Sequence, residues 1–228
     1  SGRSRMSAHP AVDLSLLRER AFAIATLAGG LCRVAMNGPV YLLPVMLQLG
    51  LGMNPVQSGA LTFLSALGAP LVRVTVGGAL RRLGFRRLLL GSAVACAASL
   101  ASFALIGCHT GAAWIGVIIV LYGLVRGTQF MTSNTLAYAD IAPERLSRAT
   151  SLGGLLQQLT VSFGVSLGAA WLGLLAPHHA PPALESFHAT FLALAVLPLL
   201  ALPGFARLKP HDGAAVSGHA AVHPSDRP

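Results

Sequence analysis

A cluster of four arginines in residues 77–87 lies between two long apolar runs, and this arrangement constrains the fold most strongly. The runs cover residues 55–76 and 88–107, so each is about the 20 residues that a helix needs to cross a bilayer. Arginine side chains are costly in hydrocarbon, so we predict that residues 77–87 form a tight loop at one membrane face. Basic loops are retained in the cytoplasm, and this loop therefore orients every other segment.

The composition extends this interpretation to the whole chain. Only 10% of the 228 residues are charged, whereas a soluble domain carries roughly 25%. The net charge of +9 would suit a nucleic-acid-binding protein, but the basic residues gather at the ends of apolar runs and form no continuous basic face. We therefore predict a polytopic membrane protein whose partner is the lipid bilayer, with no nucleic acid bound.

Apolar runs alternate with short polar turns and predict an all-α bundle of six transmembrane helices in residues 21–207. The expected helices cover about residues 21–51, 56–80, 88–107, 112–139, 149–176 and 184–205. Residues 1–20 are expected to form a cytoplasmic lead-in, and residues 208–228 a disordered cytoplasmic tail with little to bury. Loop arginines and the one lysine fall on the predicted inner side, so both termini are predicted to be cytoplasmic.

Polar side chains recur every three to four residues along the first predicted helix, from Arg33 to Gln48. This spacing places them on one helix face. A polar face inside a bilayer contacts other protein or a water-filled cavity rather than lipid. We interpret the stripe as cavity lining, and interhelical hydrogen bonding is the alternative.

Similar polar stripes follow the predicted fourth and fifth helices. The candidates for lining a substrate cavity are Arg33, Asn37, Tyr41, Gln48, Arg126, Gln129, Asn134 and Gln158. Each of these two helices also carries a GxxxG pair, at residues 123–127 and 164–168. Such pairs favour close approach of helix backbones, so we interpret these glycines as packing residues.

Catalytic and metal-binding motifs are missing from the sequence. His178, His179 and His188 lie near the predicted outer surface, but no HExxH motif accompanies them, and solvated loop histidines are the simpler interpretation. The three cysteines are scattered and include no CxxC pair, so we expect neither a disulfide framework nor a metal site. No GxSxG motif and no pair of intramembrane carboxylates occurs. We predict no enzyme activity and no cofactor.

The arginine loop resembles the loop signature of the major facilitator superfamily: a glycine, an Asp-Arg pair, a second glycine and a basic pair. The matching positions are Gly77, Arg82, Gly84, Arg86 and Arg87. Arg81 occupies the acidic position, a departure that is typical of the degenerate second copy in the C-terminal half of family members.

Other segments resemble the C-terminal part of the fourteen-helix drug:proton antiporters of the EmrB/QacA type. They are residues 41–50, 55–59, 134–140, 149–159 and 212–219. The resemblance implies a multi-pass protein of the bacterial inner membrane that contributes to proton-coupled multidrug efflux. Small amphipathic substrates and protons are then its partners.

The length of the chain sets it apart from this family, whose members have a second six-helix bundle. We therefore expect a C-terminal half, a split-gene product or a truncated frame, with the missing N-terminal half or a second copy completing the site. All seven acidic residues lie in predicted loops, tails or helix ends, so a proton-coupling carboxylate is expected in the missing half. The rival hypothesis is a non-transporting membrane fragment, or an assembly partner of another membrane protein.

Overall fold

The computed structural model describes residues 20–139, 141, 143–175 and 182–208. Most of the predicted lead-in and tail, residues 1–19 and 209–228, lie outside this part. The described residues form helices joined by short turns and include no strand, so the predicted all-α fold is confirmed.

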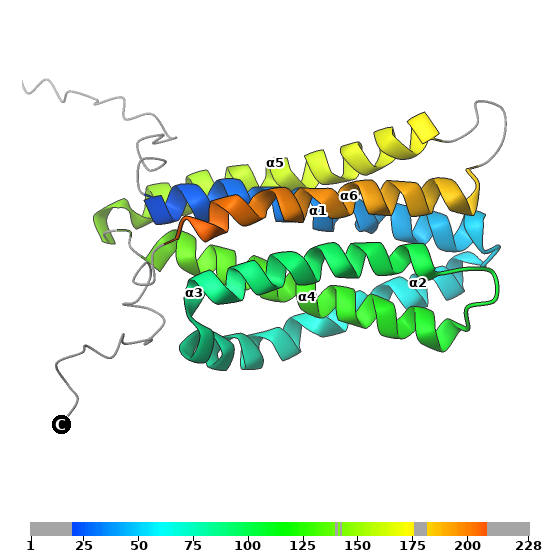
Figure 1. The fold of residues 1–228 in the computed structure, drawn as a ribbon, viewed down its shortest axis with the longest axis horizontal. Coiled ribbons are helices and arrows are strands. Elements are labelled where there is room, and N and C mark those ends of the chain that lie inside the picture. Colours follow the sequence, from blue (N-terminus) through cyan, green and yellow to red (C-terminus); the bar gives the residue numbers. More distant parts are fainter. Residues whose placement is uncertain (1–19, 140, 142, 176–181, 209–228) are drawn as a thin grey trace, which may run out of the picture.

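The helices run side by side along the long axis of the molecule (Figure 1). In chain order they are α1 (Arg20–Val45), η2 (Met46–Gly50), α2 (Pro55–Phe63), η3 (Leu64–Leu67), α3 (Gly68–Ser102), η4 (Phe103–Leu105), α4 (Ala112–Ala139), α5 (Pro143–Leu175) and α6 (Leu184–Ala206). Among the described residues, five helical spans are long and apolar enough to cross a membrane. These are Ala21–Gly50, Thr75–Leu105, Ala112–Ala139, Arg145–Leu175 and Leu184–Ala206.

The chain reverses direction at Gly84, inside α3 (Figure 1). Gly84 has φ 72° and ψ 167°, a region of backbone space that is essentially restricted to glycine. It is the one non-helical residue within Gly68–Ser102, so the predicted loop at residues 77–87 was too long. The reason is that a single glycine supplies the whole bend, which lets helix continue almost up to it on both sides.

The predicted second run, residues 56–80, is divided among α2, η3 and the first part of α3. The apolar span in α3, Thr75–Leu105, extends across the bend at Gly84. A separate crossing by residues 56–80 therefore stays a prediction.

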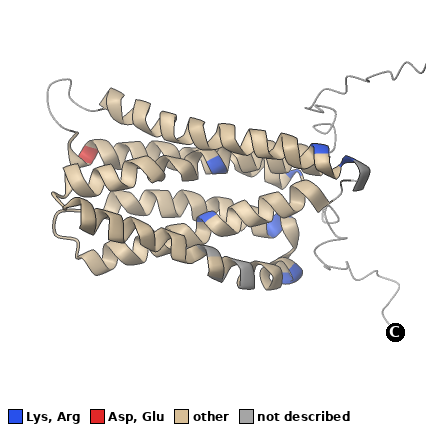
Figure 2. Cartoon of the chain, turned by 180° about the vertical axis from the view of Figure 1, so that it is seen from behind, with Lys and Arg blue, Asp and Glu red and all other residues tan. Residues whose placement is uncertain are grey.

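Charges are distributed unequally between the two ends of the bundle. Figure 2 shows most of the described basic residues at the end where α3 bends. The side chains of Arg82, Arg86 and Arg87 are exposed there. Glu185 lies in the first turn of α6, and α6 begins at the opposite end of the bundle (Figure 1). The positive-inside rule leads us to expect such a concentration of basic residues at one end of a membrane-spanning bundle.

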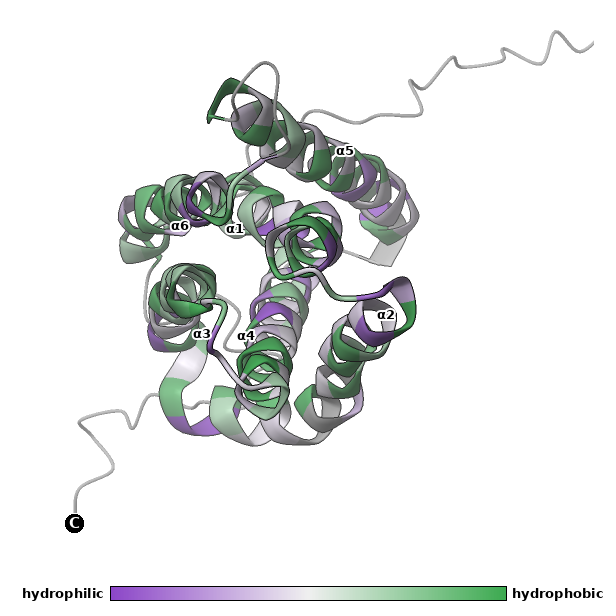
Figure 3. Cartoon of the chain, turned by 90° about the vertical axis from the view of Figure 1, so that its right-hand side faces the viewer, coloured by the Kyte–Doolittle hydropathy of each residue, from purple (hydrophilic) through white to green (hydrophobic). Residues whose placement is uncertain are grey.

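α1 is the centre of the bundle. It packs against α4, α5 and α6, while α3 packs against α4 and α6 (Figure 3). In the apolar window of α1, 56% of the residues are buried, compared with 17% in α5. One side of α5 therefore faces away from the other described helices.

Glycines bring the helix backbones together at two contacts of the bundle. A Cβ atom on Gly123 of α4 would lie 2.2 Å from the Ser65 carbonyl oxygen of η3. A Cβ atom on Gly164 of α5 would lie 2.3 Å from the Val34 carbonyl oxygen of α1. Both distances are too short for any larger residue, which supports the packing interpretation of the two GxxxG pairs.

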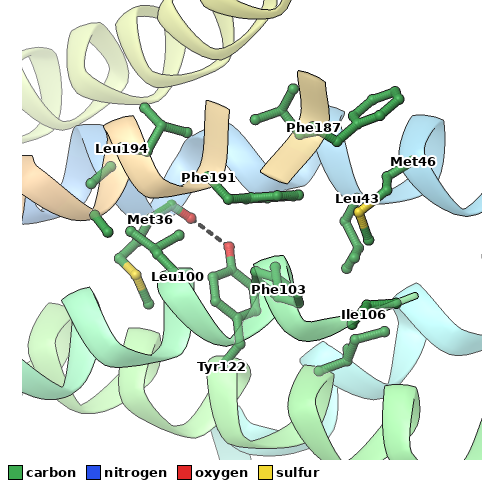
Figure 4. Packing of buried hydrophobic residues seen from close by; sticks show 14 of the residues in the cluster. Met36, Leu43, Met46, Leu100, Phe103, Ile106, Tyr122, Phe187, Phe191 and Leu194 are labelled. Carbon is green, nitrogen blue, oxygen red and sulfur yellow. Dashed lines mark hydrogen bonds between the residues drawn. The ribbon is translucent and has the colours of Figure 1, made fainter. Parts of the chain in front are cut away.

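Two clusters of buried apolar side chains fill the bundle. One surrounds Phe22, Phe85 and Phe205 next to the bend at Gly84. The other contains Tyr122, Phe103 and neighbours from α1, α4 and α6 (Figure 4). In this second cluster the Phe103 ring lies with its centroid 5.4 Å from that of Tyr122, in an edge-to-face arrangement. Aromatic pairs of this geometry contribute about 0.5–1.5 kcal/mol beyond the area that they bury.

Substitution of Gly84 tests whether the backbone bends at this residue. Gly84→Ala is expected to destabilise the protein by about 1–3 kcal/mol, because an alanine is strained at the φ and ψ of this position. Gly78→Ala is the matched control, since Gly78 is helical and a Cβ there meets nothing within 4 Å. Thermal unfolding of the purified protein in detergent measures both. Equal unfolding temperatures for the two variants would contradict the assigned bend.

Candidate functional site

A cavity of about 360 Å³ lies between α1, η3, α4 and α5. We call it the central cavity. Its polar lining includes Arg33, Asn37, Ser65, Arg126, Gln129, Ser133 and Gln157. Apolar side chains, including Met36, Phe130 and Val161, form much of the remaining wall. A mostly apolar cavity with a few convergent polar groups is the usual form of a small-molecule site.

Asn37 connects α1 to α4 at the wall of the central cavity. Its side chain is only 2% exposed. The Arg126 guanidinium donates from Nη2 to the Asn37 Oδ1 at 2.8 Å. The Asn37 Nδ2 donates to the Arg33 carbonyl oxygen one turn earlier, also at 2.8 Å. Both ends of the amide are therefore hydrogen-bonded, as a buried amide requires.

Arg33 is held by a different set of contacts with α4. Its Nη2 donates to the Asn134 Oδ1 at 3.0 Å. Its guanidinium carbon lies 4.9 Å from the centroid of the Phe130 ring, a cation–π arrangement. The described contacts of both arginines are thus with uncharged groups: an amide and an aromatic ring for Arg33, and an amide for Arg126. Both arginines are half-buried.

Gln129 belongs to a buried polar chain between α3 and α4. The Ser92 hydroxyl donates to the Gln129 Oε1, and the Gln129 Nε2 donates to the Ser133 Oγ at 3.3 Å. All three side chains are buried. These hydrogen bonds hold the Gln129 amide in a fixed orientation at the edge of the cavity. Gln129 therefore stabilises the contact between α3 and α4 as well as lining the cavity.

Arg126 also borders a second cavity, of about 350 Å³, which we call the side cavity. Pro39, Pro44 and Tyr122 contribute to its wall. Ser65 lines both cavities together with Arg126. The Arg126 side chain therefore lies at the boundary between the two spaces.

The sequence-predicted lining residues are only partly brought together. Arg33, Asn37, Arg126 and Gln129 line the central cavity. Asn134 borders a small neighbouring pocket and reaches the site through its hydrogen bond to Arg33.

Three other candidates lie elsewhere in the bundle. Tyr41 is 39% exposed on α1. Gln48 donates to the Ser58 Oγ at 3.4 Å, and this hydroxyl donates to the Pro44 carbonyl oxygen, so Gln48 joins α2 to the end of the first helix. Gln158 is exposed on the outer side of α5.

Gln157 lines the central cavity and was not among the candidates. A signal for it was present in the sequence. Gly164 lies two helical turns later, so the face of α5 that packs on α1 also carries Gln157. Ser133 belongs to the polar stripe of the predicted fourth helix, although it was not chosen as a candidate. Phe130 could not be found from the sequence, because only its contact with Arg33 distinguishes it from a packing residue.

The residues of the loop signature lie outside both cavities. Gly77, Arg82, Arg86 and Arg87 are exposed around the bend at Gly84. Their role is therefore separate from that of the cavity residues.

A multi-pass, all-α membrane protein with a polar cavity inside its helical bundle is the class that the fold and the site define. The chain belongs to the Major Facilitator Superfamily, whose sequence profile matches residues 3–165.

Curated relatives agree with this assignment. The chain is 27% identical over 214 residues to "Probable transport protein HsrA" of Haemophilus influenzae, covering 93% of this chain and 46% of the relative. It is 32% identical over 209 residues to "Putative multidrug resistance protein MdtD" of Cronobacter sakazakii, covering 86% of this chain and 42% of the relative. A protein of the same name from Pectobacterium atrosepticum is 30% identical over 202 residues, with 87% and 43% covered. The chain spans less than half the length of these relatives.

The wall between α1 and α4 can be tested at Tyr122. Its hydroxyl donates to the Met36 carbonyl oxygen at 2.5 Å inside the core (Figure 4). Tyr122→Phe should destabilise the protein by about 0.5–1.5 kcal/mol, because this buried hydrogen bond is lost. Tyr41→Phe is the matched control on an exposed tyrosine and should leave the unfolding temperature unchanged. Equal effects of the two substitutions would argue against the Tyr122 bond.

Proposed function

We propose that the chain is the C-terminal half of a transporter that exports small amphipathic compounds across the bacterial inner membrane, coupled to protons. The observation that carries the proposal is the central cavity, in which two arginines lie inside the membrane-spanning helices α1 and α4. Charged groups at membrane depth are costly and mark substrate or ion pathways. The names of the MdtD relatives support multidrug export, and that of the HsrA relative supports transport.

Alternating access in this class of transporter requires two bundles around a site near the bilayer midplane. The described helices supply one wall of such a site, and their α5 is buried on one side only. A second bundle, either the remaining part of a longer transporter or another copy of this chain, would cover the cavity. The proton-coupling carboxylate would then belong to that second bundle.

The arginines around Gly84 have a conformational role in this proposal. Arg82, Arg86 and Arg87 are exposed at the end of the bundle that we assign to the cytoplasm, where they could bridge to acidic groups or helix ends of the second bundle. Such bridges would form in one access state and open in the other, so the loop acts as part of the gate and does not bind substrate.

The proposed orientation can be tested with the native cysteines. Cys108 is exposed in the turn before α4, whereas Cys32 and Cys96 are buried. A membrane-impermeant maleimide should therefore label wild-type protein in intact spheroplasts, and Cys108→Ser should abolish the labelling. An Arg86→Cys substitution in the Cys108→Ser background should react only after permeabilisation. The reverse pattern would invert the topology.

The transport proposal predicts that this chain needs a second bundle. Cells would express the chain with or without the part of the Cronobacter sakazakii relative that it does not cover. Efflux of fluorescent amphipathic dyes of anionic, neutral and cationic type is then compared. We expect efflux only with the partner, and its loss in Arg33→Ala, because the cavity wall is incomplete in this chain alone. Efflux by purified monomeric chain in liposomes would refute the requirement for a partner. No efflux of any dye in either case would favour an assembly role instead.

A further inference from the structure

We propose that the central cavity selects amphipathic anions, whose carboxylate, sulfonate or phosphate group binds between Arg33 and Arg126. This inference deepens the proposed function by naming the charge of the substrate, and it rests on that function for its physiological meaning. Its physical basis, the charge balance of the cavity, is independent of transport.

The described lining of the cavity contains two guanidinium groups and no Asp or Glu. The acidic side chain of Glu185 lies in the first turn of α6 and is not part of this lining. Arg33 and Arg126 are instead held by the side-chain oxygens of Asn134 and Asn37. Amide oxygens accept a hydrogen bond but do not neutralise a charge, so the described walls leave the cavity positive.

Both arginines retain hydrogen-bonding capacity for a ligand. A guanidinium has five N–H donors, and each of these two makes one described hydrogen bond to a side chain. Planar guanidinium groups match carboxylate, sulfonate and phosphate oxygens, often with two parallel hydrogen bonds. An anionic head group would thus satisfy donors and charge at once, whereas a cation would be repelled by both groups.

The rest of the lining selects an apolar body for the same ligand. Met36, Phe130 and Val161 offer apolar contacts beside the arginines. The volume of about 360 Å³ lies within the range of small-molecule sites, roughly 300–1,000 Å³. The expected ligand is therefore an aromatic or aliphatic acid of moderate size, and not an inorganic ion.

Two fluorescent probes that differ in one charged group test this inference. 1-Anilinonaphthalene-8-sulfonate carries a sulfonate on the same ring system as neutral N-phenyl-1-naphthylamine. The full chain in lipid nanodiscs is titrated with each probe, and the signal of empty nanodiscs of the same lipid is subtracted. We expect the sulfonate to bind about tenfold more tightly than the neutral probe, because charge-assisted hydrogen bonds form only with the anion. Equal affinities, or tighter binding of the neutral probe, would overturn the proposal.

Substitutions then assign the preference to the two arginines. Arg33→Gln and Arg126→Gln should each weaken binding of the sulfonate by about tenfold and leave the neutral probe unchanged. Arg148→Gln removes a charge from an exposed position of α5 and is the matched control. Asn37→Asp places a carboxylate against Arg126 and should also lower the affinity for the sulfonate. An unchanged preference in all three cavity variants would overturn the assignment.

Binding of the neutral probe also reports whether the cavity is intact. If a glutamine variant loses both probes, Arg33→Lys and Arg126→Lys decide, since they keep the charge: a retained preference for the sulfonate supports the proposal and a lost one contradicts it. The outcome is separable from that of the proposed function. A chain that prefers the anion but supports no efflux with a partner refutes transport alone, and efflux restricted to cationic dyes refutes the anion preference alone.

Discussion

A guanidinium group inside a bilayer is separated from bulk water, and protein groups have to replace part of the hydrogen bonding that it loses. In this structure the replacement comes from amide side chains that connect α1 with α4. Arg126 donates a hydrogen bond to the side chain of Asn37, and Arg33 donates one to the side chain of Asn134. These two pairs fix the rotation of both helices about their axes, because each amide has to face the opposite helix. The four side chains of these two pairs lie in or beside the lining of the central cavity.

Close packing at the glycines complements these polar contacts. Gly123 allows η3 to lie against α4, and Gly164 allows α5 to lie against α1. In lipid, helices gain little from burying apolar surface against one another, so small residues and interhelical hydrogen bonds supply much of the specificity. The tight contacts at Gly123 and Gly164 join η3 and α5 to the helices that carry the two arginines of the cavity.

The sequence was sufficient for the fold class, and several of the site residues that it suggested lie around one cavity. Bilayer-length apolar runs predict helices because unsatisfied backbone groups are too costly in hydrocarbon. Arg33 and Asn37 of the predicted stripe lie on the face of α1 that borders the central cavity. Gln48 instead bonds to Ser58 of α2, after Pro39, Pro44 and the π turn η2 have changed the register of the first helix. A substrate role for these residues stays a prediction. The extent of the turn at Gly84 depends on one φ angle, which no pattern of polarity encodes.

The exposed side of α5 carries both polar and large apolar side chains. Ser162, Ser166 and Gln158 lie on it among large apolar residues such as Phe163. A helix facing only lipid gains nothing from polar side chains, whereas a helix facing another bundle can use them as hydrogen-bonding partners. A second bundle at this face would shield the central cavity from lipid and lower the local dielectric constant. Electrostatic attraction between the arginine pair and an anion strengthens as the dielectric constant falls. Closure of the bundles would therefore strengthen the preference for anions that we propose for the cavity.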